Sequence, residues 1–158
     1  MRALFVSLGL ILTARTAAAE RAGGVGVGAL LGEPVAATAM LRWNEREAIQ
    51  GVVGWSFGQK RMHVGADYLY TATEIEADDR MGLRYPVYVG AGLRVRMLGE
   101  DTTAGKERGN VGLRFPFGVS VEPDHLPLEV YFEMAPVWVM IPVSHGGFDG
   151  GIGLRVFL

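Results

Sequence analysis

A strict two-residue alternation runs through most of this chain and constrains its fold more than any other feature. After residue 23, apolar side chains occupy every second position in eight successive runs, and the spacing of an amphipathic helix is missing. Because successive side chains of a β-strand point to opposite faces, each run predicts a strand with one apolar face. Turn sequences such as Gly32-Glu33-Pro34 separate the runs. The expected strands span residues 24–31, 35–43, 49–57, 62–70, 85–97, 111–121, 128–138 and 148–158.

Eight strands of about ten residues match the smallest transmembrane β-barrels. An open sheet of this size would leave two long edges without hydrogen-bond partners, and closure into a ring removes both edges. No Pro- or Ser-rich linker divides residues 20–158. We therefore expect an all-β chain with one domain, folded as a closed eight-stranded antiparallel up-and-down β-barrel.

The second face of the alternation is rich in glycine and arginine, which predicts that it lines the barrel interior. On a water-facing strand surface, each glycine would cost about 0.5–1 kcal/mol in chain entropy. An arginine facing lipid at the bilayer midplane would cost about 2–4 kcal/mol. We therefore expect the apolar face to contact lipid, and the arginines to pair with carboxylates inside. The predicted interior network contains Arg42, Asp67, Arg94, Arg96, Arg114, Glu129, Glu133, Asp149 and Arg155.

Lysine and aromatic positions also favour a membrane barrel. The two lysines, Lys60 and Lys106, both fall in expected turns, whereas a soluble barrel usually carries lysine on its outer strands. The aromatic residues gather at strand ends, as they do at the two lipid–water interfaces of a membrane barrel. One girdle is predicted to contain Trp43, Tyr68, Tyr70 and Tyr85, and the other Trp55, Phe57, Trp138 and Phe148.

The N-terminus has the pattern of a secretory signal peptide. Arg2 supplies a positive start, residues 3–14 are apolar, and Ala17-Ala18-Ala19 offers small residues to a signal peptidase. We expect cleavage after Ala19, which makes residues 1–19 the signal peptide and residues 20–158 the barrel domain. With both barrel termini in the periplasm, the outer loops would be 32–34, 58–61, 98–109 and 143–147.

One pair of residues could carry acyl-transfer chemistry. A two-residue hairpin at Gln59-Lys60 would place Ser56 directly opposite His63, with both side chains inside the barrel. Serine, histidine and a carboxylate are the minimum for nucleophilic acyl transfer. Asp67 lies on the same face but about 13 Å further along the strand, too far to orient the imidazole. A non-catalytic polar plug is therefore the main interpretation, and a lipid acylhydrolase or acyltransferase is the alternative.

Composition narrows the remaining function classes. The chain has no cysteine, which excludes a thiol nucleophile, a disulfide framework and a cysteine-based zinc site. Its formal net charge of -2 gives no sign of nucleic-acid binding. We expect no metal and no cofactor.

Several segments carry a family resemblance, in order along the chain. They are 32–34 (GEP), 55–58 (WSFG), 67–70 (DYLY), 86–90 (PVYVG), 112–118 (GLRFPFG), 127–130 (PLEV) and the glycine-rich end at 150–158. Together they resemble a widespread family of small bacterial outer-membrane β-barrel proteins, similar in architecture to OmpA-type eight-stranded barrels. The resemblance implies fold and location, and no mechanism.

The sequence therefore favours a structural or interaction role in the outer membrane of a Gram-negative bacterium, without catalytic activity. The expected partners are outer-membrane lipids and the barrel-assembly machinery, for which Gly153, Val156 and Leu158 have the hydrophobic spacing of a terminal signal. We expect a monomer and no nucleic-acid partner. Two alternatives stay open: a lipid-modifying acyl enzyme that uses Ser56 and His63, and a soluble periplasmic barrel that binds an apolar ligand.

Overall fold

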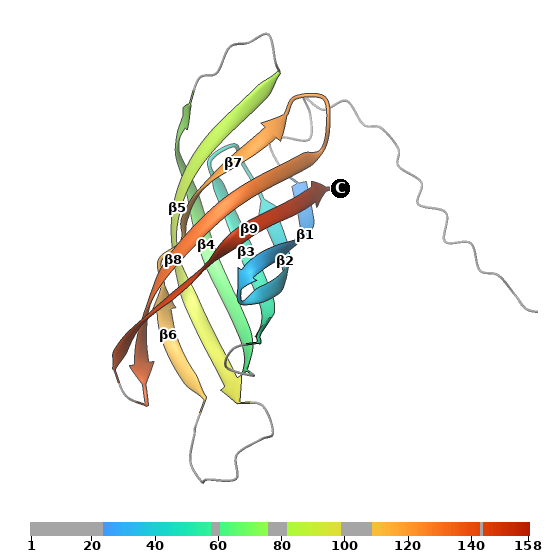
Figure 1. The fold of residues 1–158 in the computed structure, drawn as a ribbon. Coiled ribbons are helices and arrows are strands. Elements are labelled where there is room, and N and C mark those ends of the chain that lie inside the picture. Colours follow the sequence, from blue (N-terminus) through green and yellow to red (C-terminus); the bar gives the residue numbers. More distant parts are fainter. Residues whose placement is uncertain (1–23, 58–60, 76–81, 99–108, 143) are drawn as a thin grey trace, which may run out of the picture.

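The computed structural model describes residues 24–57, 61–75, 82–98, 109–142 and 144–158, which form strands joined by turns (Figure 1). The nine strands of these residues are β1 (Gly24–Glu33), β2 (Val35–Arg42), β3 (Glu47–Ser56), β4 (Arg61–Ile75), β5 (Leu83–Leu98), β6 (Asn110–Arg114), β7 (Phe117–Pro123), β8 (Leu128–Ile141) and β9 (His145–Phe157). None of the described residues belongs to a helix long and apolar enough to span a membrane.

The strands close into a ring. Each strand pairs antiparallel with its neighbours, and the first and last strands pair with one another from Gly26 opposite Phe157 to Glu33 opposite Gly150. Strands β6 and β7 together occupy one place between β5 and β8, so the ring has eight positions. The predicted closed, antiparallel, up-and-down barrel is confirmed.

The expected strand over residues 111–121 is interrupted, which the alternation did not predict. Strand β6 ends at Arg114 and β7 begins at Phe117. Proline has no backbone N–H, so Pro116 cannot donate to a strand ladder. The ring stays connected across the break, because Gly90 N donates to Pro116 O at 2.7 Å and Phe115 N donates to Pro136 O at 3.0 Å.

Strand β4 extends well beyond the strand that the sequence predicted. The strand predicted over residues 62–70 is longer in the structure, where β4 continues to Ile75 and pairs with β5 as far as Ile75 opposite Tyr85. A register shift between Thr71 and Thr73 accommodates this extension. The alternation does not show this extension, because a strand that projects beyond an apolar belt has polar residues on both faces.

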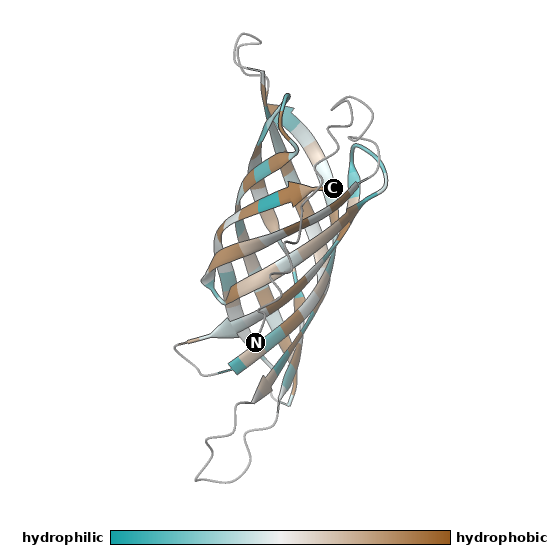
Figure 2. Ribbon diagram, turned by 90° about the vertical axis from the view of Figure 1, so that its right-hand side faces the viewer, coloured by the Kyte–Doolittle hydropathy of each residue, from teal (hydrophilic) through white to brown (hydrophobic). Residues whose placement is uncertain are grey.

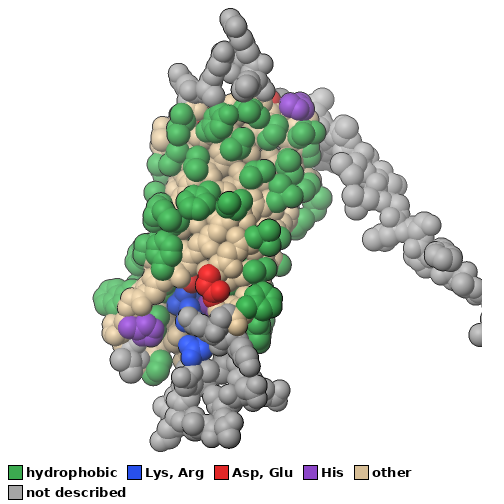
Figure 3. All heavy atoms as spheres, viewed as in Figure 1, with side chains coloured by type: hydrophobic (Ala, Val, Ile, Leu, Met, Phe, Trp, Pro, Cys, Tyr) green, Lys and Arg blue, Asp and Glu red, His purple; other side chains and the backbone are tan. Residues whose placement is uncertain are grey.

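The two faces of the wall differ in chemistry. Outward side chains are mainly large and apolar, among them Leu31, Phe148 and Leu154, which are 70%, 57% and 49% exposed. Figure 2 shows apolar and polar residues alternating along the strands, and Figure 3 shows hydrophobic side chains spread over the wall. Inward side chains are buried and include Arg94 and Arg155, at 2% and 1% exposure.

Glycine makes room inside the wall for large side chains. A Cβ atom at Gly153 would overlap the ring of Tyr131, which is itself 1% exposed. Small apolar clusters pack beside the charged groups, one of Leu30, Ala36, Val52 and Tyr131 and one of Met40, Ala48, Leu69 and Tyr88. Side chains therefore fill the interior, as the diameter of an eight-stranded barrel requires.

Candidate functional site

The centre of the lumen is an ion-pair cluster around Arg114 on β6. This guanidinium donates to Asp67 on β4 and to Glu133 on β8, the latter at 2.6 Å, and its Nε lies 3.6 Å from Asp149 on β9. All four side chains are at most 4% exposed. The Tyr88 hydroxyl donates to Glu133 at 3.0 Å. One arginine thus joins three strands through carboxylates that are removed from bulk water.

A second cluster surrounds Arg155 on β9. Its guanidinium donates to Glu129 on β8 at 2.7 Å and to Gln50 on β3, and it lies 4.4 Å from the centre of the Tyr131 ring. Gln50 Nε2 also donates to Glu133 at 3.3 Å, which links this cluster to the one around Arg114. Because buried charges are tolerated only when paired and hydrogen-bonded, these contacts fix which strands face one another.

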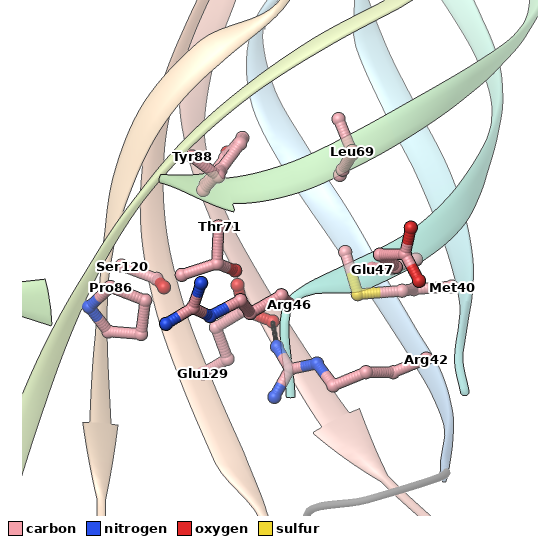
Figure 4. Close-up of a pocket in the computed structure, with 11 residues that line it drawn as sticks. Met40, Arg42, Arg46, Glu47, Leu69, Thr71, Pro86, Tyr88, Ser120 and Glu129 are labelled. Atoms are coloured by element: carbon pink, nitrogen blue, oxygen red, sulfur yellow. Dashed lines mark ion pairs between the residues drawn. The ribbon is translucent and has the colours of Figure 1, made fainter. Parts of the chain in front are cut away.

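The end of the lumen beside the chain terminus, which we call the C-terminal end, holds Arg42. This side chain donates to Glu122 at 2.9 Å, lies 3.8 Å from Glu129 and covers the Phe157 ring at 4.6 Å. A pocket of about 20 Å³ opens here, room for about one water molecule. Figure 4 shows Arg42 and Glu129 pointing toward one another at this pocket, with Arg46 and Ser120 also in its lining.

The opposite end of the lumen, which we call the loop end, lies near the β1–β2, β3–β4, β5–β6 and β8–β9 connections. Arg94 on β5 donates to Asp149 at 2.6 Å, and Ser56 donates to Glu33. His63 on β4 is 2% exposed. Figure 3 shows charged and histidine side chains together at this lower end of the barrel.

The structure places every predicted network residue on the inner face and brings most of them into ion pairs. Arg94 pairs with Asp149, Arg114 with Asp67 and Glu133, Arg155 with Glu129, and Arg42 lies near Glu129. Arg96 on β5 faces the same lumen at the loop end, in register with His63 and Asn110.

The predicted pairing of Ser56 with His63 is wrong. Ser56 lies opposite Arg61, and His63 lies opposite Gly54. Strand β3 ends at Ser56 and β4 begins at Arg61, so the connection is four residues long and the register moves by two. Residues 58–60 of this turn lie outside the described residues. Ser56 and His63 still share the inner face as diagonal neighbours, but the Ser56 hydroxyl donates to Glu33.

Sequence reasoning missed four contributors to the lumen. Glu122 lies just beyond the strand predicted over residues 111–121, yet it belongs to β7 and pairs with Arg42. Glu122 is two residues after the inward-facing Ser120, so the alternation alone could have placed it on the inner face. Gln50, Tyr88 and Tyr131 also occupy inward positions. Gln50 accepts a hydrogen bond from Arg155, the Tyr88 hydroxyl donates to Glu133, and the Tyr131 ring packs against the Arg155 guanidinium.

The predicted girdle residues lie toward the two barrel ends. At the C-terminal end, the rings of Trp43 and Tyr68 are 6.1 Å apart, and both donate to Glu47, at 3.2 and 2.6 Å. Tyr70 and Tyr85 lie opposite Glu47 and Ile75. Toward the loop end, Trp55, Trp138 and Phe148 lie opposite Met62, Gly146 and Pro136, and Phe57 follows β3. Trp138 Nε1 donates to Ser144 at 2.8 Å.

Some predictions fall outside the described residues. These are the signal peptide at 1–19 with its cleavage after Ala19, the turn lysines Lys60 and Lys106, and most of the loop 98–109. Within the described residues, no three His, Asp or Glu side chains are grouped so that they could hold a metal ion.

One solved structure matches the architecture. The N-terminal β-barrel domain of Pseudomonas aeruginosa OprF superimposes with a TM-score of 0.66, over 88% of this chain and 98% of that domain, at 9% sequence identity. The chain has the fold of that β-barrel. The OmpA-type architecture implied by the sequence resemblance is therefore confirmed. No family model and no curated protein matches the sequence.

Proposed function

We propose that this chain is an outer-membrane β-barrel protein with a structural or interaction role. Its periplasmic export through residues 1–19, its contact with outer-membrane lipids and its delivery by the barrel-assembly machinery are parts of this proposal. The observation that supports it most is the inverted distribution of chemistry, with apolar side chains outside and ion pairs inside.

The outer face has the chemistry of a lipid contact. Residues such as Leu31, Ile152 and Leu154 are 70%, 59% and 49% exposed on the outer face, whereas the inner face of the same wall carries buried ion pairs. A contiguous apolar surface of this kind in water would drive association, whereas in a bilayer it is stabilised by the lipid chains. The described strands are paired all around the ring, so none of them offers an open backbone edge to lipid.

The filled lumen favours a structural role over transport of large solutes or storage of an apolar ligand. Arg114 and Arg155, with their carboxylate and amide partners, cross the interior from several strands. An apolar ligand would have to displace buried ion pairs, and removal of one partner of such a pair is strongly destabilising. The soluble, ligand-binding alternative has no comparable support.

Tryptophan fluorescence tests the placement of the barrel in a membrane. Trp43, Trp55 and Trp138 are 41%, 39% and 56% exposed on the outer face. In vesicles of brominated lipids, we expect quenching that is strongest when the bromine atoms lie near the headgroups, because the indoles belong to the two interfaces. Fluorescence that is insensitive to the bromine position in every vesicle would contradict the proposal.

The enzymatic alternative has a separate test. Ser56 and His63 lie on one inner face, but the Ser56 hydroxyl donates to Glu33 rather than to the imidazole. We expect the Ser56→Ala variant and the unaltered protein to release the same amount of fatty acid from outer-membrane lipids. A release that depends on Ser56 would establish the acyl-enzyme function instead.

A further inference from the structure

A single carboxylate lies among aromatic rings on the outer face of the barrel, at its C-terminal end. Glu47 begins β3 and is two residues before Ile49, which is 49% exposed, so the alternation places Glu47 on the outer face. Trp43 and Tyr68 donate to its carboxylate, and Tyr70 lies opposite it in the ladder between β3 and β4. We call Trp43, Glu47, Tyr68 and Tyr70 the Glu47 site.

The surrounding residues hold the Glu47 carboxylate in one position. Its Oε2 accepts from Trp43 Nε1 at 3.2 Å and from Asn44 Nδ2 at 2.5 Å, and its Oε1 accepts from the Tyr68 hydroxyl at 2.6 Å. Asn44 is itself fixed, because its Oδ1 accepts from the backbone N–H groups of Arg46 and Glu47, both at 2.8 Å. The carboxylate is therefore ordered before any ligand binds.

The negative charge of Glu47 has no cationic partner within the described part of the chain. All three side-chain donors to the carboxylate are neutral groups, and no ion pair of the described residues includes Glu47. An ionised carboxylate accepts about four hydrogen bonds, so Oε1 has room for one more donor. A cation with an N–H group would supply both the missing charge and the missing hydrogen bond.

The rings beside Glu47 add a second attraction for a cation. Trp43 and Tyr68 are 41% and 42% exposed, so both keep accessible surface on the outside of the barrel. Their ring centres are 6.1 Å apart and their planes are inclined at 37°. An ammonium group is attracted to the face of an indole or phenol ring. A carboxylate between two such rings therefore has the chemistry of an ammonium site.

Apolar side chains continue the outer surface from the Glu47 site toward the middle of the barrel. Ile49 lies opposite Leu41 on β2 and opposite Tyr68 on β4. Leu41 and Ile49 are 52% and 49% exposed. A ligand with an ammonium group at one end and a hydrocarbon chain at the other matches this order of residues. A membrane lipid has that form, whereas a dissolved amine would leave the apolar part without a contact.

We propose that the Glu47 site binds the primary ammonium group of a phosphatidylethanolamine headgroup. The ammonium N–H donates to Oε1 of Glu47, its charge lies against the rings of Trp43 and Tyr68, and an acyl chain of the same lipid contacts Leu41 and Ile49. This inference rests on the proposed function, because it requires the outer wall to face a membrane.

Fluorescence quenching by brominated lipids tests the site in the full barrel protein, folded into vesicles of phosphatidylcholine. Trp55→Phe together with Trp138→Phe leaves Trp43 as the single tryptophan. Phosphatidylethanolamine and phosphatidylcholine have the same net charge, but only the former has N–H donors on its nitrogen. From the quenching of Trp43, we expect brominated phosphatidylethanolamine to bind about threefold more tightly than brominated phosphatidylcholine.

Two variants in this background test the residues of the site. Glu47→Gln keeps an acceptor oxygen but removes the charge, so the preference for phosphatidylethanolamine should disappear. Tyr68→Leu removes a ring and a donor and should weaken the preference, which keeps the test decisive if one variant does not fold. Glu74→Gln is the matched control, because Glu74 is a carboxylate at the same end that already pairs with Arg84. Its preference should equal that of the unaltered site.

A second background with Trp138 as the single tryptophan reports on the loop end, where the indole donates to Ser144. We expect no preference between the two lipids there. Equal binding of both lipids beside Trp43, a preference that survives in both site variants, an equal loss in Glu74→Gln, or the same preference at Trp138 would each overturn the proposed site and leave the membrane placement standing. Absence of quenching of both tryptophans by either lipid would overturn the membrane placement and the site together.

Discussion

Gly153 and Tyr131 illustrate how single residues determine the interior of this barrel. The Tyr131 ring occupies the space over Gly153 and covers the Arg155 guanidinium at 4.4 Å. Arg155 in turn donates to Glu129 and Gln50. A glycine that looks unremarkable in sequence therefore sets the position of an aromatic ring and, through that ring, of a buried ion pair.

Substitution of Gly153 by alanine tests this dependence. The added Cβ atom would overlap the Tyr131 ring, so we expect Gly153→Ala to lower the free energy of unfolding by about 1–3 kcal/mol. Gly51→Ala is the control, since a Cβ atom there meets only Ala39 O at 3.9 Å, and it should be neutral or stabilise by up to about 1 kcal/mol. Urea titration in one detergent measures both, and equal effects would contradict the account.

Buried and exposed ion pairs should respond differently to the loss of an arginine. Arg155 and Glu129 have side chains 1% and 2% exposed, whereas Arg84 and Glu74 are 24% and 39% exposed. Arg155→Met removes the 2.7 Å hydrogen bond to Glu129, leaves that carboxylate with Arg42 at 3.8 Å, and should cost about 3–5 kcal/mol. Arg84→Gln should cost less than about 1 kcal/mol. Unfolding free energies compare the two variants, and a cost for Arg155→Met as small as that for Arg84→Gln would show that the buried pair is dispensable.

At the scale of the elements, the alternation predicted the strands because a period of two has only one structural interpretation when it repeats. It did not predict where strands end. Glu74 and Glu122 lie outside the predicted strands 62–70 and 111–121, but both are paired in strands. The β3–β4 turn was given two residues instead of four, because hairpin length is set by the pairing of both strands and leaves a weak trace in sequence.

For the candidate site, the sequence predicted which side chains face the lumen but not which of them contact one another. The two-residue alternation placed Arg114, Asp67 and Glu133 on the inner face. It does not show which strands bring their side chains into contact across a closed barrel. The contacts of Arg155 with Gln50 and of Tyr88 with Glu133 connect strands that are not neighbours in the ring, so they depend on the diameter and stagger of the barrel.

Two leucines with the same exposure can test whether the strands, unlike the turns, face the lipid. Leu154 on β9 and Leu126 between β7 and β8 are both 49% exposed. If the strands span a bilayer, Leu154→Arg should cost about 2–4 kcal/mol when folding is measured in lipid vesicles, and Leu126→Arg should cost at most about 1 kcal/mol. Equal costs for the two substitutions would indicate that β9 does not face the bilayer interior.

At the scale of the whole molecule, the ring and its filling support one another. The pairing of β1 with β9 leaves the described strands without an open edge. The ion pairs of Arg114 with Asp67 and of Arg94 with Asp149 connect strands that the backbone ladders do not join. The similarity to the OprF barrel domain at 9% identity fits this view. The two chains therefore share the closed fold while most of their residues differ.

The most direct test of the central claim is the electrophoretic mobility of the protein in an isolated outer-membrane fraction, with and without boiling. A closed membrane barrel keeps its ladder in SDS until it is heated, since no strand edge is open to the detergent. The account predicts that the protein is found in this fraction and that its band shifts on boiling. Recovery in the soluble periplasmic extract, with the same mobility before and after boiling, would contradict it.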